Sequence, residues 1–208
     1  MTGDARAVVL SRVRAALGPA PATPAPIARD YRQADRAVYA EALVARFCER
    51  VAEYRASVHR ATEHSLDEVV ARLLAGRRVL VPAAAPSAVC GCAVVGDEPP
   101  LTARELDGAD AALTGCALAV AETGTIVLDG SAVCGRRALT LVPDHHVCVV
   151  RAEQIVADVP GAIAALRRLD ATGRPITLIS GPSATSDIEL ERVEGVHGPR
   201  VLDVVVVG

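Results

Sequence analysis

The chain has 208 residues, of which 51% are hydrophobic and 2% aromatic, and its formal net charge is −3. This length and apolar content predict a globular domain with a buried core of Val, Leu, Ile and Ala, and they exclude general disorder. All the basic side chains apart from His are Arg. Without Lys, the chain can form neither a Schiff base nor a phosphate loop that ends in Gly-Lys-Ser/Thr. The small negative charge gives no general reason to expect nucleic-acid binding.

The N-terminal part predicts a helix followed by a linker. Apolar residues recur at near-helical spacing from Asp4 to Leu17, and Gly18 is a typical stop signal. A segment with four Pro follows, which is typical of an extended linker. We therefore divide the chain into an arm, residues 1–34, and an α/β domain, residues 35–208. An arm of this kind packs on its own domain or on a partner subunit, so a homo-oligomer is possible.

Two helices are expected next. The first begins near Asp35, and Ser65 to Glu68 has the spacing of a capping box that starts the second. The apolar stripe of the first helix is Tyr39, Leu43, Phe47, Val51, Tyr54 and Val58, which we expect in the core. The buried face of the second helix is Leu66, Val69, Val70, Leu73 and Leu74, and Gly76 ends it.

Arg78 to Pro82 indicates the first buried strand. The uncharged run from Val79 to Gly96 has nearly the length of a membrane span, but Pro and Gly interrupt it. We interpret this run as a strand, a loop and a short buried helix. No membrane span is expected, and the six scattered Cys residues are typical of reduced thiols in a cytoplasmic protein.

The rest of the chain alternates between strand-like and helical patterns. A helix is expected from Asp158, which caps it, to Leu169. The expected strands are 111–113, 118–121, 125–128, 147–150, 176–179 and 204–207. Strands that are apolar throughout indicate a sheet covered on both faces. The sequence therefore predicts an α/β fold with a mostly parallel sheet covered by helices on both faces.

The loop after Ile179 is rich in hydroxyl and acidic side chains. Backbone N–H groups of a Gly/Ser turn can hold a carboxylate or phosphate without any Lys. The candidate ligand-binding residues are Ser180, Gly181, Ser183, Thr185, Asp187 and Glu189. Ser186 and Glu189 also have capping-box spacing, so the segment can equally be the start of a helical turn.

Two further segments are candidates for the same site. Glu122 follows an uncharged run and precedes Thr123, Gly124 and Thr125. A carboxylate at the end of a buried segment can act as a base or a nucleophile, or it can be a surface acid in a hairpin.

His197, next to Gly198, can act as an acid or base, although a lone His in a turn is more often structural. We expect Glu122, the Ser180–Glu189 loop and His197 to meet at one end of the sheet. The chain also contains adjacent His145 and His146, whose side chains would diverge on a strand and could not share a metal ion.

Arg136 and Arg137 could meet an anion or solvent, and the sequence does not decide between these. No metal site is predicted, because no zinc-binding motif is present.

Four segments together resemble the LUD domain, and specifically the lactate-utilization protein C family. They are AETGTIVL (121–128), RRALTLVPDHHVCVV (136–150), ISGPSATSDIE (179–189) and GVHGP (195–199). Ala184 departs from the resemblance, since relatives often carry a larger or polar residue there. The resemblance implies a fold similar to the sugar-phosphate isomerase and CoA-transferase-like proteins. It also implies a role in oxidising L-lactate to pyruvate, together with partner proteins that carry iron–sulfur clusters.

The chain itself lacks the Cys spacing for an iron–sulfur cluster and a Gly-x-Gly-x-x-Gly dinucleotide motif, so we expect no cofactor on it. The leading hypothesis is an accessory protein or subunit of a lactate-oxidising system that binds a small carboxylate or other anion. One alternative is a stand-alone CoA-transferase-like or phosphosugar-isomerase-like enzyme that uses Glu122. Another is a ligand sensor or scaffold without catalysis.

Overall fold

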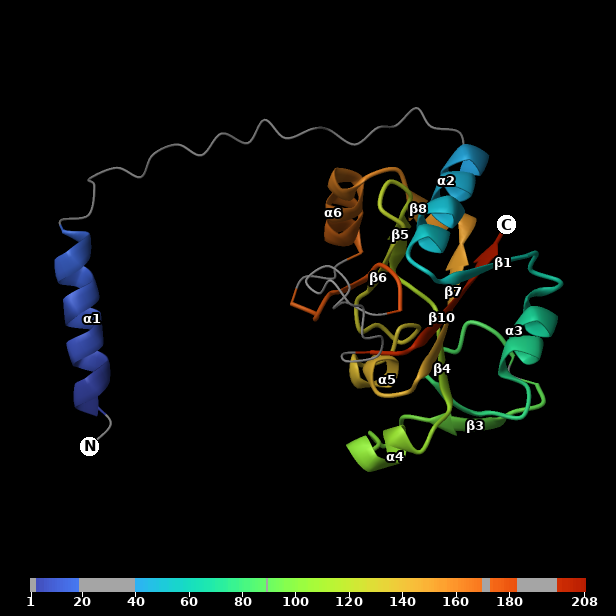
Figure 1. The fold of residues 1–208 in the computed structure, drawn as a ribbon, viewed down its shortest axis with the longest axis horizontal. Helices are drawn as coiled ribbons and strands as arrows, with labels where there is room; N and C mark the ends of the chain where they lie inside the picture. The colour runs from blue at the N-terminus through green and yellow to red at the C-terminus, as the bar shows by residue number, and fades with distance from the viewer. Residues whose placement is uncertain (1–2, 19–39, 89, 170–172, 183–197) are drawn as a thin grey trace. The chain divides into compact units, whose positions relative to one another are not determined.

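A parallel sheet of six strands lies at the centre of the computed structural model, which describes residues 3–18, 40–88, 90–169, 173–182 and 198–208 (Figure 1). The order of its strands is β1-β10-β7-β4-β2-β3, and each neighbouring pair is parallel. The strands are β1 (Ser57–Ala61), β2 (Arg78–Val81), β3 (Ala93–Gly96), β4 (Ala111–Thr114), β7 (His145–Arg151) and β10 (Val201–Val207). The mostly parallel α/β sheet that the sequence predicts is therefore confirmed.

A second, smaller sheet has the order β8-β5-β6-β9. Its strands are β5 (Leu118–Val120), β6 (Thr125–Leu128), β8 (Ile155–Val156) and β9 (Thr177–Ile179). The turn between β5 and β6 is too short for a parallel crossover, so these strands pair antiparallel. β9 also pairs antiparallel with β6, at the edge of the sheet. The sequence predicted β5, β6 and β9, but it predicted neither β8 nor the separation of these strands into a sheet of their own.

The helices are α1 (Gly3–Leu17), α2 (Ala40–Glu53), α3 (Leu66–Leu74), α4 (Ala103–Asp107), α5 (Ala138–Leu141) and α6 (Val159–Arg168), with a 3-10 turn at Ala152–Gln154. α1 belongs to one compact unit, Met1–Tyr31, and the other elements belong to a second unit, Arg32–Gly208. The predicted division between residues 34 and 35 lies outside the described residues. As the sequence predicts, the Asp158 carboxylate caps α6, and it accepts a hydrogen bond of 2.8 Å from the Gly161 N–H.

Alternate residues of the central strands point to two separate apolar clusters. On one face, the side chains of α3 pack against Val147 and Val149 of β7 and Val205 of β10. On the other face, α2 and the smaller sheet pack against Cys148 and Val150 of β7. α6 covers the outer face of the smaller sheet. Figure 1 shows α3 on one side of the large sheet and the smaller sheet with α6 on the other.

Helix α2 is shorter than the apolar stripe predicts. Phe47 and Val51 are buried in the core as expected, but the helix ends at Glu53. Arg55 has a φ of 64°, a left-handed conformation that breaks the helix and turns the chain into β1. Tyr54 is consequently 40% exposed, and Val58 lies in β1. The prediction that these two residues extend the helical stripe was wrong, because a local backbone conformation overrides the periodicity.

Two further local predictions were also wrong. α3 begins after Ser65 as expected, but Ser65 is in a helical conformation and its side chain does not cap the helix. Its hydroxyl instead interacts with Thr62. The expected short helix near Gly96 is the edge strand β3, which pairs with β2. No helix among the described residues is long and apolar enough to cross a membrane.

Candidate functional site

A chain of hydroxyl groups connects the turn of the β5–β6 hairpin to the end of β9. The Oγ1 atoms of Thr123 and Thr125 are 2.7 Å apart, and Thr125 Oγ1 is 2.8 Å from Ser180 Oγ. Two of the segments predicted for one site therefore meet, although they are far apart in the sequence. The sequence predicted a buried strand before Ser180, but β9 is an edge strand and Leu178 in it is 66% exposed.

Gly124 and Gly181 bring these two segments close to the C-terminal end of α2. Both have positive φ values, 62° and 85°. A Cβ on Gly124 would lie 2.8 Å from backbone atoms of Arg50 and Val51, and one on Gly181 would lie 2.8 Å from the Tyr54 carbonyl oxygen. Both the backbone conformation and the close approach therefore require Gly.

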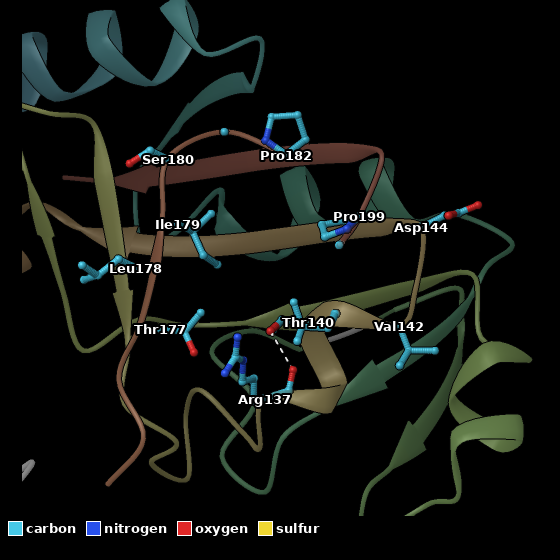
Figure 2. A pocket seen from close by; sticks show the side chains of 13 residues that line it. Arg137, Thr140, Val142, Asp144, Thr177, Leu178, Ile179, Ser180, Pro182 and Pro199 are labelled. Carbon is cyan, nitrogen blue, oxygen red and sulfur yellow. Dashed lines mark hydrogen bonds between the residues drawn. The ribbon is translucent and has the colours of Figure 1, made fainter. Parts of the chain in front are cut away.

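A pocket of about 690 Å³ opens beside this junction. It lies between β9, α5 and the segments that precede β7 and β10, and Figure 2 shows β9 and α5 on opposite sides of it. The residues that line it are Arg137, Thr140, Leu141, Val142, Asp144, Thr177, Leu178, Ile179, Ser180, Gly181, Pro182, Gly198 and Pro199. Ser180, Gly181 and Gly198 were predicted for the site, whereas Thr140 and Thr177 were not.

The other predicted site residues fall into two groups. Glu122, Thr123, Gly124 and Thr125 are described, and they are not among the residues that line the pocket. Ser183, Thr185, Asp187, Glu189 and His197 lie outside the described residues. Catalytic roles for Glu122 and His197 stay predictions.

Arg136 and Arg137 are adjacent in the chain but have different surroundings. The Arg136 guanidinium forms an ion pair with Asp97 and donates a hydrogen bond of 2.6 Å to the Leu101 carbonyl oxygen. The hydrogen bond from Arg136 holds the pKa of Asp97 below its usual value. Arg137 lines the pocket, and no residue in the described part of the chain forms an ion pair with its guanidinium.

One carboxylate also lines the pocket, that of Asp144. It is 3.4 Å from the Arg200 guanidinium, and both side chains are 65% exposed. Water and Arg200 therefore screen this negative charge. The Arg137 guanidinium can bind an anion here, and the hydroxyl group of Thr177 can supply an additional hydrogen bond.

The two adjacent His side chains point to opposite faces of β7, as the sequence predicts. His145 Nε2 is 2.6 Å from Asp203 Oδ2, whereas His146 Nε2 is 2.8 Å from Thr114 Oγ1. Burial, with a smaller contribution from His145, lowers the pKa of His146 from 6.5 to about 4. His146 is therefore a neutral, buried side chain at pH 7.

Three of the Cys residues, Cys116, Cys134 and Cys148, lie in the core beside α2. The interaction with Cys148 and then burial raise the pKa of Cys116 well above its usual value, and burial raises that of Cys134 to about 11. Protonated, buried thiols are poor nucleophiles and poor metal ligands. Within the described residues, no group of three or more His, Cys, Asp or Glu side chains could hold a metal ion.

The chain is an α/β protein with a pocket, lined by polar and apolar residues, next to its central sheet. The family model of the LUD domain matches residues 96–207, and the chain belongs to the LUD-domain family. Over 206 residues it is 50% identical to lactate utilization protein C of Deinococcus radiodurans, and the match covers 98% of this chain and 91% of that protein.

Two other relatives extend the comparison. Lactate utilization protein C of Bacillus subtilis is 34% identical over 100 residues, which is 46% of this chain and 41% of that protein. A crystal structure of a DUF162-family protein from Deinococcus radiodurans has a TM-score of 0.72 and 44% identity. The similarity covers 82% of this chain and 99% of that one, and it supports the assignment of the fold.

Substitution of Gly124 tests the close packing behind the pocket. Gly76 has a similar φ, 70°, but a Cβ there would meet nothing within 4 Å. We expect Gly76→Ala to cost about 1–2 kcal/mol of unfolding free energy through backbone strain alone. Gly124→Ala should cost about 1–3 kcal/mol more, because its Cβ must also displace α2. Urea unfolding measures both, and equal losses would contradict the packing described for Gly124.

The lowered pKa of His146 predicts a loss of stability in acid. His146 is protonated near pH 6.5 in the unfolded chain but only near pH 4 in the folded chain. Its contribution to the unfolding free energy is therefore fully present above pH 6.5 and is lost as the pH falls towards 4. The unfolding free energy should fall between pH 7.5 and 4.5 by about 2–3 kcal/mol more in the wild type than in His146→Gln. His64→Gln, at an exposed His, is the control and should follow the wild type. Parallel curves for all three proteins would refute this assignment.

Proposed function

We propose that the chain takes part in the use of L-lactate, as a non-redox subunit or accessory protein of a system that oxidises lactate to pyruvate. Membership of the LUD-domain family and the 50% identity to a lactate utilization protein C over nearly the whole chain support this proposal. The chain would work in the cytoplasm and bind a small carboxylate or other anion.

The observation that carries the binding role is the Arg137 guanidinium in the pocket. No described residue neutralises this charge with an ion pair, and Thr177, which carries a hydroxyl group, lines the same pocket. A carboxylate can accept hydrogen bonds from a guanidinium and from hydroxyl groups at the same time. A small acid such as lactate or pyruvate would replace the water around Arg137 with directed hydrogen bonds.

The proposal places the electron carriers on other proteins. Oxidation of lactate to pyruvate removes two electrons, which iron–sulfur clusters on partner proteins would accept one at a time. The protonated thiols of Cys116 and Cys134 are held in the core, which suits packing and not cluster ligation. This chain would therefore bind the acid or support the assembly, and would carry no cofactor of its own.

Calorimetry with lactate, pyruvate and inorganic phosphate tests the binding role. Arg137→Gln should weaken binding by about 1–3 kcal/mol, because it removes a charge-assisted hydrogen bond. Arg72→Gln, at an exposed arginine of α3 outside the pocket, is the matched control and should bind like the wild type. If Arg137→Gln binds as well as Arg72→Gln, the pocket is not the anion site.

A deletion in the native host tests the physiological role. The strain without this gene should lose growth on L-lactate and keep growth on pyruvate, since only the oxidation step is affected. Expression of the chain from a plasmid should restore growth on lactate. An affinity-tagged copy should co-purify with proteins that show iron–sulfur absorption, and normal lactate oxidation by the deletion strain would contradict the proposed function.

A further inference from the structure

The pocket is much larger than a three-carbon acid requires. Its volume is about 690 Å³, within the range of roughly 300–1,000 Å³ that is typical for drug-sized ligands. One water molecule occupies about 30 Å³ of liquid, so the pocket has room for roughly 20 water molecules. Lactate or pyruvate bound to Arg137 would leave most of this space to solvent.

Apolar side chains line much of the remaining surface. They come from both sides of the pocket, Ile179 from β9 and Leu141 and Val142 from the α5 side. Figure 2 shows the Ile179 side chain on the side of β9 that faces α5, whereas the Leu178 side chain points the other way. Leu141 is 37% exposed, and Ile179 is partly buried against the core. Apolar side chains on both sides of a concave surface are typical of a ligand site, because a ligand that covers them removes apolar area from water.

The charges that line the pocket limit the ligand to one anionic group. Arg137 is the one cation among the lining residues in the described part of the chain. No second cation among the described lining residues could neutralise another negative charge, and the Asp144 carboxylate would not attract one. A doubly charged phosphate ester or dicarboxylate therefore fits this pocket less well than a monoanion does.

We propose that the pocket binds a monocarboxylate with a hydrocarbon body longer than that of lactate. The carboxylate contacts Arg137, and the hydrocarbon body covers the side chains of Leu141 and Ile179. This inference depends on the proposed function for the position of the carboxylate at Arg137. It goes beyond that function in the class of ligand, because the apolar walls select for chain length.

A series of straight-chain acids measures this selection. Calorimetry on the full chain with acetate, butyrate, hexanoate and octanoate should show an affinity that rises about two- to fourfold for each added methylene group, until the apolar walls are covered. Arg137→Gln should weaken every member of the series by a similar factor. Leu141→Ser should reduce the gain per methylene and leave acetate unchanged.

Leu169→Ser is the matched control, since Leu169 is 48% exposed and does not line the pocket. It should show the same gain per methylene as the wild type. An affinity that does not change along the series, with lactate still bound through Arg137, would overturn this inference and leave the proposed function intact. An equal gain per methylene in Leu141→Ser would also overturn it, because the hydrocarbon would then bind elsewhere. Binding of none of these acids, lactate included, would overturn both proposals.

Discussion

The buried carboxylate of Asp203 joins three neighbouring strands of the central sheet, and the position of the pocket depends on it. Asp203 in β10 lies 2.7 Å from His59 Nε2 of β1 and 2.6 Å from His145 Nε2 of β7. Burial alone would raise the pKa of Asp203, but the hydrogen bonds from His145 and His59 lower it below its usual value, so the group is ionised at neutral pH. A carboxylate only accepts hydrogen bonds, and each His must therefore carry a proton on Nε2. This interaction fixes the start of β10 against the start of β7, and the residues that precede these two strands line the pocket.

Ligands in open parallel sheets usually bind beyond the carboxyl ends of the strands. Here the segment 131–135 covers part of that edge: the Ala132 carbonyl oxygen accepts a hydrogen bond from Ala84 N–H, and that of Val133 accepts one from Gly115 N–H. A Cβ on Gly115 would lie 2.6 Å from Val133, so this contact is close. The described pocket lies instead at the amino ends of β7 and β10, where β9 of the smaller sheet passes by. The smaller sheet thus supplies a wall that a single doubly wound sheet would not have.

The parts of this fold that depend on local patterns could be predicted from the sequence. The apolar runs identified most strands of the central sheet, and the Asp158 cap with Pro160 identified α6. The end of α2 could not be predicted, because it depends on the left-handed conformation of Arg55. Nor could the sequence show which of Arg136 and Arg137 forms an ion pair. The partner is Asp97, which follows a different strand and lies next to Arg136 only in the folded chain. Thr125 and Ser180 are far apart in the sequence, so no local pattern indicates that their hydroxyl groups form a hydrogen bond.

Long-range contacts outside the pocket hold the residues on both of its sides in place. Asp97 and the Leu101 carbonyl oxygen hold Arg136, and Arg137 follows it directly, so the backbone that carries the pocket's cation is fixed from outside the pocket. On the opposite side, Thr125 holds Ser180, and Gly181 packs against the end of α2. A ligand that contacts both Arg137 and β9 therefore bridges the central sheet and the smaller sheet. Because such a ligand binds only when the two sheets are correctly placed, its binding free energy adds to the stability of their arrangement.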